Sequence, residues 1–309
     1  AMSAAFYFGI DGGGTYSRLA IVDEAGNVRA RVKAGSTNIY SVSKEAVFGN
    51  LNTLLDSALN AGGLQKDDLS AGCLGSAGLG RPGEAAMFRG FFDTLLRPGF
   101  PVTLCTDGEI LLCGGLRGLE GYCLIAGTGS LALGRSAAGR LVRVGGHGYM
   151  LGDEGAAAWI GKTAIARALR SEEGRDLETA MLGDILAFCK LTESPDLVRY
   201  VHHDADKAKI AALAPVVTAA ARKGDPLALD ILHTGAAELA LLVKSVLARS
   251  PWITRRELVL AGGVMEHDEI LGGKLRNILA EEFPGLILRE PQGTALEGAC
   301  ILARKQAGV

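Results

Sequence analysis

The chain has 309 residues and a formal net charge of −2, with 32 Lys and Arg against 34 Asp and Glu. This length predicts two domains, and the scattered charge disfavours a nucleic-acid partner, which would need a basic face. We expect a cytoplasmic protein with no membrane partner, because the sequence shows no secretory leader and no apolar run of transmembrane length. The cysteines form no CxxC pair and no zinc-type cluster. We interpret them as reduced thiols: Cys73, Cys105, Cys113, Cys123, Cys189 and Cys300.

The N-terminal part predicts a β-meander followed by α/β units. Strand-like runs at 6–10 and 17–23 flank a glycine turn, and a second turn leads into the alternating segment 28–34. This pattern predicts three antiparallel strands. Hydrophobic periodicity then predicts helices and strands in alternation. The expected elements are a helix at 44–60, a strand at 71–78, a helix at 84–97, a strand at 101–107 and a helix at 109–116.

The same opening pattern returns at 122–144, again as strand, glycine turn, strand, small-residue turn and strand. Such an internal repeat at the scale of a domain predicts a duplicated architecture. The later elements are expected to be helices at 156–190 and 205–248, a strand, turn and helix at 256–271, and a closing helix at 294–306. We therefore expect two α/β lobes with a ligand cleft between them. The first would span 1–117, with the C-terminal helix 295–309 packed back onto it, and the second 118–294, with helical insertions.

Three glycines between Asp11 and Thr15 form a candidate phosphate loop. A P-loop needs a Lys-Ser/Thr pair that opens a helix, and a dinucleotide fingerprint also needs a helix after the glycines. Here the segment 17–23 continues as a strand, so both interpretations fail. A β-hairpin tip remains, and its backbone N–H groups can approach phosphate closely because glycine has no Cβ. An ordinary hairpin turn is the alternative; the second glycine tip at 127–130 favours phosphate binding by a pair of tips.

The motifs resemble those of a known family. DGGGT (11–15), GTGS (127–130) and AGGV (261–264), in this order, resemble the three nucleotide-contacting segments of the superfamily of sugar kinases and actin. GGHGYMLGDEGAAAWIG (145–161) resembles the signature of the N-acetylglucosamine kinase branch of the BadF/BadG/BcrA/BcrD ATPase family. The resemblance runs from Gly9 to about Gly298. It implies a duplicated ribonuclease H-like (actin-like ATPase) fold, and a homodimer.

The resemblance also implies a reaction. The γ-phosphate of ATP, with Mg²⁺ as cofactor, would pass to the 6-hydroxyl of an amino sugar. The acceptor would be N-acetylglucosamine or a close relative, glucosamine or N-acetylmuramic acid.

The nucleotide site implied by this resemblance draws on all three glycine segments. Thr15 and Thr128 match threonines that contact phosphate, although turn chemistry is an alternative explanation for both. Gly262 and Gly263 would let the backbone approach the adenosine, and a tight strand–helix turn would explain them equally well. Gly235-Ala236 is expected on the other side of the base. The full expected set is Asp11 (holding Mg²⁺ through water), Gly13, Gly14, Thr15, Thr128, Gly129, Gly262 and Gly263.

Asp107 follows a strand and precedes a helix, so it is either a helix N-cap or, as the resemblance implies, the general base for the sugar hydroxyl. Four other residues match sugar-contacting positions: Asn38, Gly146, His147 and Asp153. An Asx-turn is the alternative for Asn38, whereas for Asp153 an N-cap role is compatible with a sugar contact. His147 stands where mammalian relatives have tryptophan, which leaves the choice of amino sugar open.

Two rival functions compete with a kinase. An ATPase activator of 2-hydroxyacyl-CoA dehydratases and benzoyl-CoA reductases needs cysteines that hold an iron–sulfur cluster between two subunits. Cys105, Cys113 and Cys123 are candidates, but they lie in or beside predicted strands and helices, where buried thiols are common. A sugar-responsive regulator needs a DNA-binding segment, and we expect none because the sequence begins at its first glycine hairpin.

Overall fold

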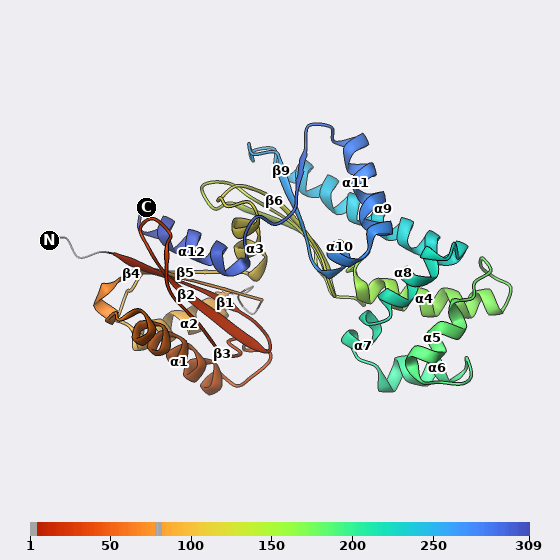
Figure 1. Cartoon of the computed structure of the whole chain (residues 1–309), viewed down its shortest axis with the longest axis horizontal. Helices are drawn as coiled ribbons and strands as arrows, with labels where there is room; N and C mark the ends of the chain where they lie inside the picture. Colours follow the sequence, from red (N-terminus) through yellow and green to blue (C-terminus); the bar gives the residue numbers. More distant parts are fainter. Residues whose placement is uncertain (1–4, 78, 80–81) are drawn as a thin grey trace. The chain divides into compact units, whose positions relative to one another are not determined.

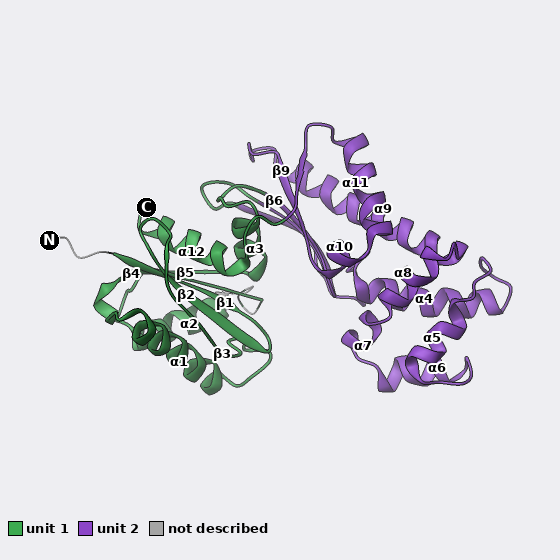
Figure 2. Cartoon of the chain, viewed as in Figure 1, with its two compact units in different colours: residues 1–121, 135–140, 291–309 green, residues 122–134, 141–290 purple. Residues whose placement is uncertain are grey.

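The computed structural model describes residues 5–77, 79 and 82–309, and the chain divides into two compact units (Figure 2). Unit 1 comprises residues 1–121, 135–140 and 291–309, and unit 2 comprises residues 122–134 and 141–290. The chain therefore passes from one unit to the other at four points in the sequence. Each unit is built on one five-stranded sheet.

The sheet of unit 1 has the strand order β3-β2-β1-β4-β5. Its first strand pairs antiparallel with β2 and parallel with β4, and β2 pairs antiparallel with β3, which confirms the predicted meander. The expected strand 71–78 corresponds to β4, although Gly78 lies outside the described residues. The strands are β1 (Phe6–Gly12), β2 (Tyr16–Asp23), β3 (Val28–Gly35), β4 (Leu69–Ser76) and β5 (Val102–Cys105).

Helices cover both faces of this sheet (Figure 1). The first two helices pack on one face, over a core that includes Phe8, Phe88 and Phe92. The last helix of the chain packs on the other face, where a Cβ on Gly9 would lie 2.5 Å from the backbone nitrogen of Cys300. The helices are α1 (Lys44–Gly62), α2 (Pro82–Leu95), α3 (Asp107–Gly115) and α12 (Ala295–Gln306), with a short 3-10 turn at Lys66–Asp68.

Two glycines bring α12 into backbone contact with α3. A Cβ on Gly114 would lie 1.9 Å from the carbonyl oxygen of Thr294, and one on Gly298 would lie 1.8 Å from that of Ile110. No real Cβ fits at these distances, so the two helices can approach this closely only because both residues are glycine.

The sheet of unit 2 has the order β10-β9-β6-β7-β8. When the strands of each unit are numbered one to five along the chain, both sheets have the same order: third, second, first, fourth and fifth. The repeat confirms the predicted duplicated ribonuclease H-like fold. The strands are β6 (Gly121–Ala126), β7 (Ser130–Arg135), β8 (Leu141–Gly145), β9 (Glu257–Ala261) and β10 (Ile287–Arg289). The sequence did not predict β10, which is too short to show a pattern.

The two long helices predicted for unit 2 are wrong, because the structure divides them. Gly174 ends the first segment with a left-handed backbone (φ +72°), and Gly224 (φ +85°) precedes Asp225. Asp225 accepts a hydrogen bond from the amide of Ala228 and caps α9, with Pro226 at the first helical position as predicted. The helices are α4 (Ala157–Glu172), α5 (Met181–Cys189), α6 (Asp196–Arg199), α7 (Lys207–Ala211), α8 (Ala214–Arg222), α9 (Pro226–Arg249), α10 (Gly263–His267) and α11 (Glu269–Glu282), with a π-turn at Tyr200–Asp204.

Helix α9 is the one helix in the described part of the chain that is long and apolar enough to cross a membrane, although the sequence suggested no such run. Half of its apolar window is buried within the structure. Ile231, Leu239 and Val243 belong to the core of unit 2. We therefore interpret α9 as the central helix of that core.

The contact between α3 and α12 predicts opposite effects for two glycine substitutions. Gly298→Ala should lower the free energy of unfolding by roughly 1–3 kcal/mol, because the new methyl group must push two helices apart. Gly49→Ala is the matched control, since a Cβ there meets nothing within 4 Å. It should raise the free energy of unfolding by roughly 0.5–1 kcal/mol, as alanine favours a helix interior. Urea denaturation of both variants tests this, and effects of the same sign would contradict it.

Candidate functional site

The first glycine hairpin joins β1 to β2 in unit 1. Gly14 and Thr15 at its tip are exposed to solvent. A Cβ on Gly13 would lie 2.3 Å from the carbonyl oxygen of Tyr16, so no larger residue fits there. The tip therefore presents backbone groups and one hydroxyl, as expected of a phosphate loop.

Asp11 lies at the same edge of the sheet as the strand end that leads to Asp107. It pairs with Gly75 of β4, and Gly75 pairs in turn with Cys105 of β5. The Asp11 carboxylate accepts a hydrogen bond of 2.6 Å from the Arg18 guanidinium through Oδ2. Asp11 thus has one carboxylate oxygen in an ion pair.

The loop that carries Asn38 packs against the first hairpin. The Ser36 hydroxyl donates to the carbonyl oxygen of Gly13 at 2.8 Å. Asn38 accepts a hydrogen bond of 2.9 Å from the amide of Tyr40 through Oδ1, which is the Asx-turn considered above. Its Nδ2 has no partner among the described residues and can still donate to a ligand. The structure therefore brings Asn38 to the predicted phosphate tip.

Asp107 is the first residue of α3, and its side chain is exposed. The N-cap of this helix is Thr106, so the alternative interpretation of Asp107 as the cap is wrong. Thr106 and Glu109 form a capping box, in which each side chain accepts a hydrogen bond from the backbone amide of the other residue. The Asp107 carboxylate accepts only the amide of Gly108, at 2.9 Å, from the part of the chain that the structure describes.

The second glycine hairpin joins β6 to β7, and the start of α4 lies against it. The amide of Ala157 donates to the carbonyl oxygen of Gly127 at 2.9 Å, and that of Ala158 donates to Thr128 at 3.2 Å. The first amides of a helix have no partner within the helix. Here the hairpin supplies acceptors for two of them, which fixes the GDEG segment beside the predicted phosphate tip.

Asp153 is buried, and its carboxylate contacts the second hairpin. Its carboxylate accepts the amide of Ser130 at 3.2 Å and forms an ion pair of 2.8 Å with Lys207. A Cβ on Gly129 would lie 2.7 Å from Oδ2 of Asp153. The N-cap of α4 is Ala156, so the capping interpretation of Asp153 is wrong. The predicted contact of Asp153 with sugar stays a prediction.

The segment with Gly146 and His147 follows β8 in a loop of left-handed glycines. Gly145 has φ +76°, Gly146 φ +71° and Gly148 φ +86°. The Arg143 guanidinium donates to the carbonyl oxygen of Gly146 at 3.0 Å. The His147 side chain is exposed and is available to a ligand.

The third glycine segment lies against the second hairpin. Gly262 has φ +101°, and a Cβ there would lie 2.5 Å from the carbonyl oxygen of Ala126. The following residue, Gly263, lines a pocket of about 650 Å³ together with Gly127 and Thr128. Two segments that are far apart in the sequence thus form one pocket within unit 2.

The remaining walls of this pocket were not predicted. They come mainly from α7, α8 and the link between them, and they consist of small apolar residues: Ala208, Ala211, Ala212, Ala214 and Pro215. The alanine-rich run is the only sequence signal, and helix packing explains such a run equally well. Gly235 and Ala236, expected on the other side of the base, do not line this pocket, and their place beside the base stays a prediction. Gly235 packs against Gly155 and the Trp159 ring, in the middle of α9.

Charged groups at the rim of the pocket are paired with one another. The Arg222 guanidinium forms a two-pronged ion pair with Glu269, with both hydrogen bonds at 2.6 Å, which lowers the pKa of Glu269 to about 2. The buried Asp268 accepts the Thr218 hydroxyl at 2.7 Å. The pocket therefore combines an apolar slot with a glycine tip, which suits a flat heterocycle that carries phosphate.

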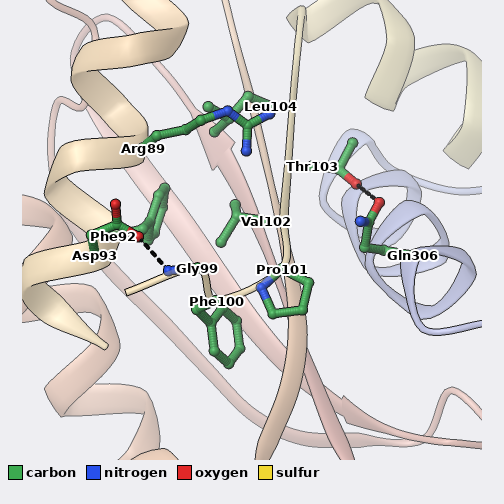
Figure 3. A pocket seen from close by; sticks show the side chains of 10 residues that line it. All are labelled: Arg89, Phe92, Asp93, Gly99, Phe100, Pro101, Val102, Thr103, Leu104 and Gln306. Atoms are coloured by element: carbon green, nitrogen blue, oxygen red, sulfur yellow. Dashed lines mark hydrogen bonds between the residues drawn. The ribbon is translucent and has the colours of Figure 1, made fainter. Parts of the chain in front are cut away.

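A second hollow, of about 510 Å³, lies in unit 1 beside the edge strand β5 (Figure 3). Its polar groups bond to one another: Thr103 donates to Gln306 at 3.1 Å, and Asp93 accepts the amide of Gly99 at 2.9 Å. None of the predicted site residues lines it, so the pocket of unit 2 is the candidate ligand site.

Comparison with known proteins identifies the family. The model of the BadF/BadG/BcrA/BcrD ATPase family matches residues 8–303. An N-acetylmuramic acid/N-acetylglucosamine kinase from Clostridium acetobutylicum is 35% identical over 97% of this chain and 99% of its own length. An N-acetyl-D-glucosamine kinase from Dictyostelium discoideum is 27% identical over 98% of each chain. A solved structure of a provisionally assigned N-acetylglucosamine kinase from Chromobacterium violaceum is 27% identical, with a TM-score of 0.72 over 97% of this chain and 99% of its own. The chain therefore belongs to the BadF/BadG/BcrA/BcrD ATPase family.

Proposed function

We propose that the protein is an ATP-dependent amino-sugar kinase. It would transfer the γ-phosphate to the 6-hydroxyl of N-acetylglucosamine or of a close relative, glucosamine or N-acetylmuramic acid. The observation that carries the proposal is the exposed Asp107 carboxylate, which stands at the sheet edge where Asp11 and the first glycine tip also lie. The names of the related proteins support an amino sugar as the acceptor.

The pocket of unit 2 would bind the adenosine, with Thr128 and the backbone of Gly127 and Gly129 directed to the phosphates. The first tip would supply further donors from Gly13, Gly14 and Thr15. Phosphoryl transfer depends mostly on positioning and on stabilisation of the charge that spreads over the phosphate oxygens. Fixed backbone donors suit this task because they do not need to reorient during the reaction.

We propose Mg²⁺ as the cofactor, held by Asp11 through water. Mg²⁺ binds proteins through one or two carboxylates and completes its shell with water and substrate phosphates. Asp11 fits this role because only one of its carboxylate oxygens is tied to Arg18. When bound, the ion would neutralise part of the phosphate charge.

Asp107 would act as the general base that accepts the proton from the sugar hydroxyl. The exposed carboxylate is accessible to a sugar hydroxyl, and the amide of Gly108 fixes its orientation. The proposed sugar contacts are Asn38 through its free Nδ2, Gly146, His147 and Asp153. We further propose that the enzyme acts in the cytoplasm as a homodimer.

The ATPase-activator alternative is less well supported. It would need thiols that can reach a cluster shared with a second subunit. Cys105, Cys113 and Cys123 are buried, with at most 5% of each residue exposed. Burial also raises the pKa of the Cys113 thiol to about 12, which disfavours the thiolate that binds metal.

Substitution of the base tests the reaction. Asp107→Asn should lower turnover by about 10²–10⁴-fold, the usual contribution of a general base. The assay is ADP release with Mg-ATP and a panel of glucosamine, N-acetylglucosamine, N-acetylmuramic acid, glucose or no sugar. Asp56→Asn, at an exposed site on α1, is the control and should keep full activity. If turnover of Asp107→Asn stays within threefold of wild type, Asp107 is not the base. If the wild-type enzyme hydrolyses ATP at the same rate with every sugar and with none, the protein is not a kinase.

Substitution in the pocket tests nucleotide binding. Ala212→Trp places a large ring in the proposed adenosine slot and should raise the KM for ATP at least tenfold, while the KM for the sugar stays within about twofold. Ala219→Trp is the matched control, because Ala219 is exposed on α8 and does not line the pocket. Equal KM values for ATP in the two variants would place the nucleotide elsewhere.

A further inference from the structure

A buried ion pair in unit 1 lies next to the proposed base. The side chains of Glu109 and Arg135 are 10% and 9% exposed, and Oε1 of Glu109 lies 3.6 Å from Nε of Arg135. Arg135 donates through Nη1 to the carbonyl oxygen of Leu119 at 2.7 Å, whereas its Nε is buried without a hydrogen-bond partner among the described residues. A buried ion pair with an unsatisfied donor contributes little to stability, because desolvation offsets the attraction. Its position is therefore more informative than its energy.

Glu109 connects this pair to the turn that carries Asp107. One of its carboxylate oxygens accepts the backbone amide of Thr106 at 3.2 Å and closes the capping box, while the other faces Arg135. Asp107 stands between Thr106 and Glu109 in the sequence. A movement of the Glu109 side chain would therefore also move the backbone of the turn that carries the proposed base.

Arg135 stands at the end of the strand that begins at the second glycine hairpin. Strand β7 starts at Ser130, directly after Gly129, and ends at Arg135. The chain passes from unit 2 to unit 1 between Gly134 and Arg135. One short strand thus leads from the proposed phosphate tip to the guanidinium that faces Glu109.

We propose that Arg135 and Glu109 are positioning residues for the base, an inference that rests on the proposed role of Asp107. Arg135 holds Glu109, and the capping box of Glu109 sets the direction of the Asp107 carboxylate. A separation of 3.6 Å exceeds hydrogen-bond length, so a shift of less than about 1 Å would close the pair. Such a shift matters, since misplacement of a catalytic group by about 1 Å can cost 10²-fold in rate.

The kinetic test uses Arg135→Met, Glu109→Gln and the double variant. Arg135→Met should lower kcat at least about tenfold and leave both KM values within about twofold, because it removes alignment of the base and no substrate contact. The double variant should lose no more than Arg135→Met alone, since both residues act through one contact. Arg167→Met is the matched control: Arg167 is a part-buried arginine of unit 2 paired with Asp176, and its loss should lower the melting temperature without changing kcat.

A measurement that does not depend on activity separates this inference from the proposed function. Amide hydrogen exchange in the segment 106–110 should become at least about tenfold faster in Arg135→Met, while the rest of unit 1 keeps its protection. Unchanged exchange there, or a kcat within twofold of wild type, would overturn the positioning role. Wild-type enzyme that phosphorylates no sugar would overturn the proposed function instead, and the exchange result would still decide whether Arg135 fixes this turn.

Discussion

The position of α3 depends on a very close backbone contact between α3 and α12. Gly114 and Gly298 let each helix reach the other's carbonyl oxygens, and Gly9 lets α12 lie directly on β1. A helix that carries the proposed base is thus fixed from one side by a segment from the far end of the chain. Because no side chains lie between these backbones, the position of α3 is defined more tightly than packing of flexible side chains would allow.

The carboxylates of the site differ in how they are bound. Asp153 is buried between the second hairpin and Lys207, Asp11 is paired with Arg18, and Asp268 is tied to Thr218. Asp107 is exposed and accepts only the amide of its own helix among the described residues. Each of the first three has a side-chain partner that fixes its carboxylate. The Asp107 carboxylate has no charged side-chain partner among the described residues, which suits the role of base proposed for it.

The sequence predicted the parts of the site that depend on local chemistry. Glycines such as Gly13 and Gly262 stand where a Cβ would collide with the backbone. The tight turn therefore requires glycine, and the glycine motif in turn predicts the tight turn. The prediction of two long helices in unit 2 failed partly because helical periodicity continues across Gly174 and Gly224, where left-handed turns divide the helices. A further break, between α7 and α8, has no left-handed residue. The repeat predicted the three-stranded meander that opens each unit, and both sheets contain it.

Features that depend on long-range contacts could not be predicted. The wall of the pocket is a run of alanines, and alanine carries no signal beyond its preference for helices. The pairing of Glu109 with Arg135 joins helix α3 to the end of strand β7, and nothing in either local sequence indicates the partner. The sequence left a cap as one alternative for Asp107 because Thr106 and Asp107 are neighbours that both favour capping, and the structure gives the cap to Thr106.

The return of α12 to unit 1 has a consequence for synthesis on the ribosome. Unit 2 is complete once residue 290 has emerged, whereas unit 1 still lacks the helix that covers one face of its sheet. Until then the surface around Gly9 and Gly114 stays open to other chains. Domains usually fold as units in the order of their synthesis. Here the unit that begins first finishes last, so one face of its sheet can be covered only after the whole of unit 2 has been synthesised.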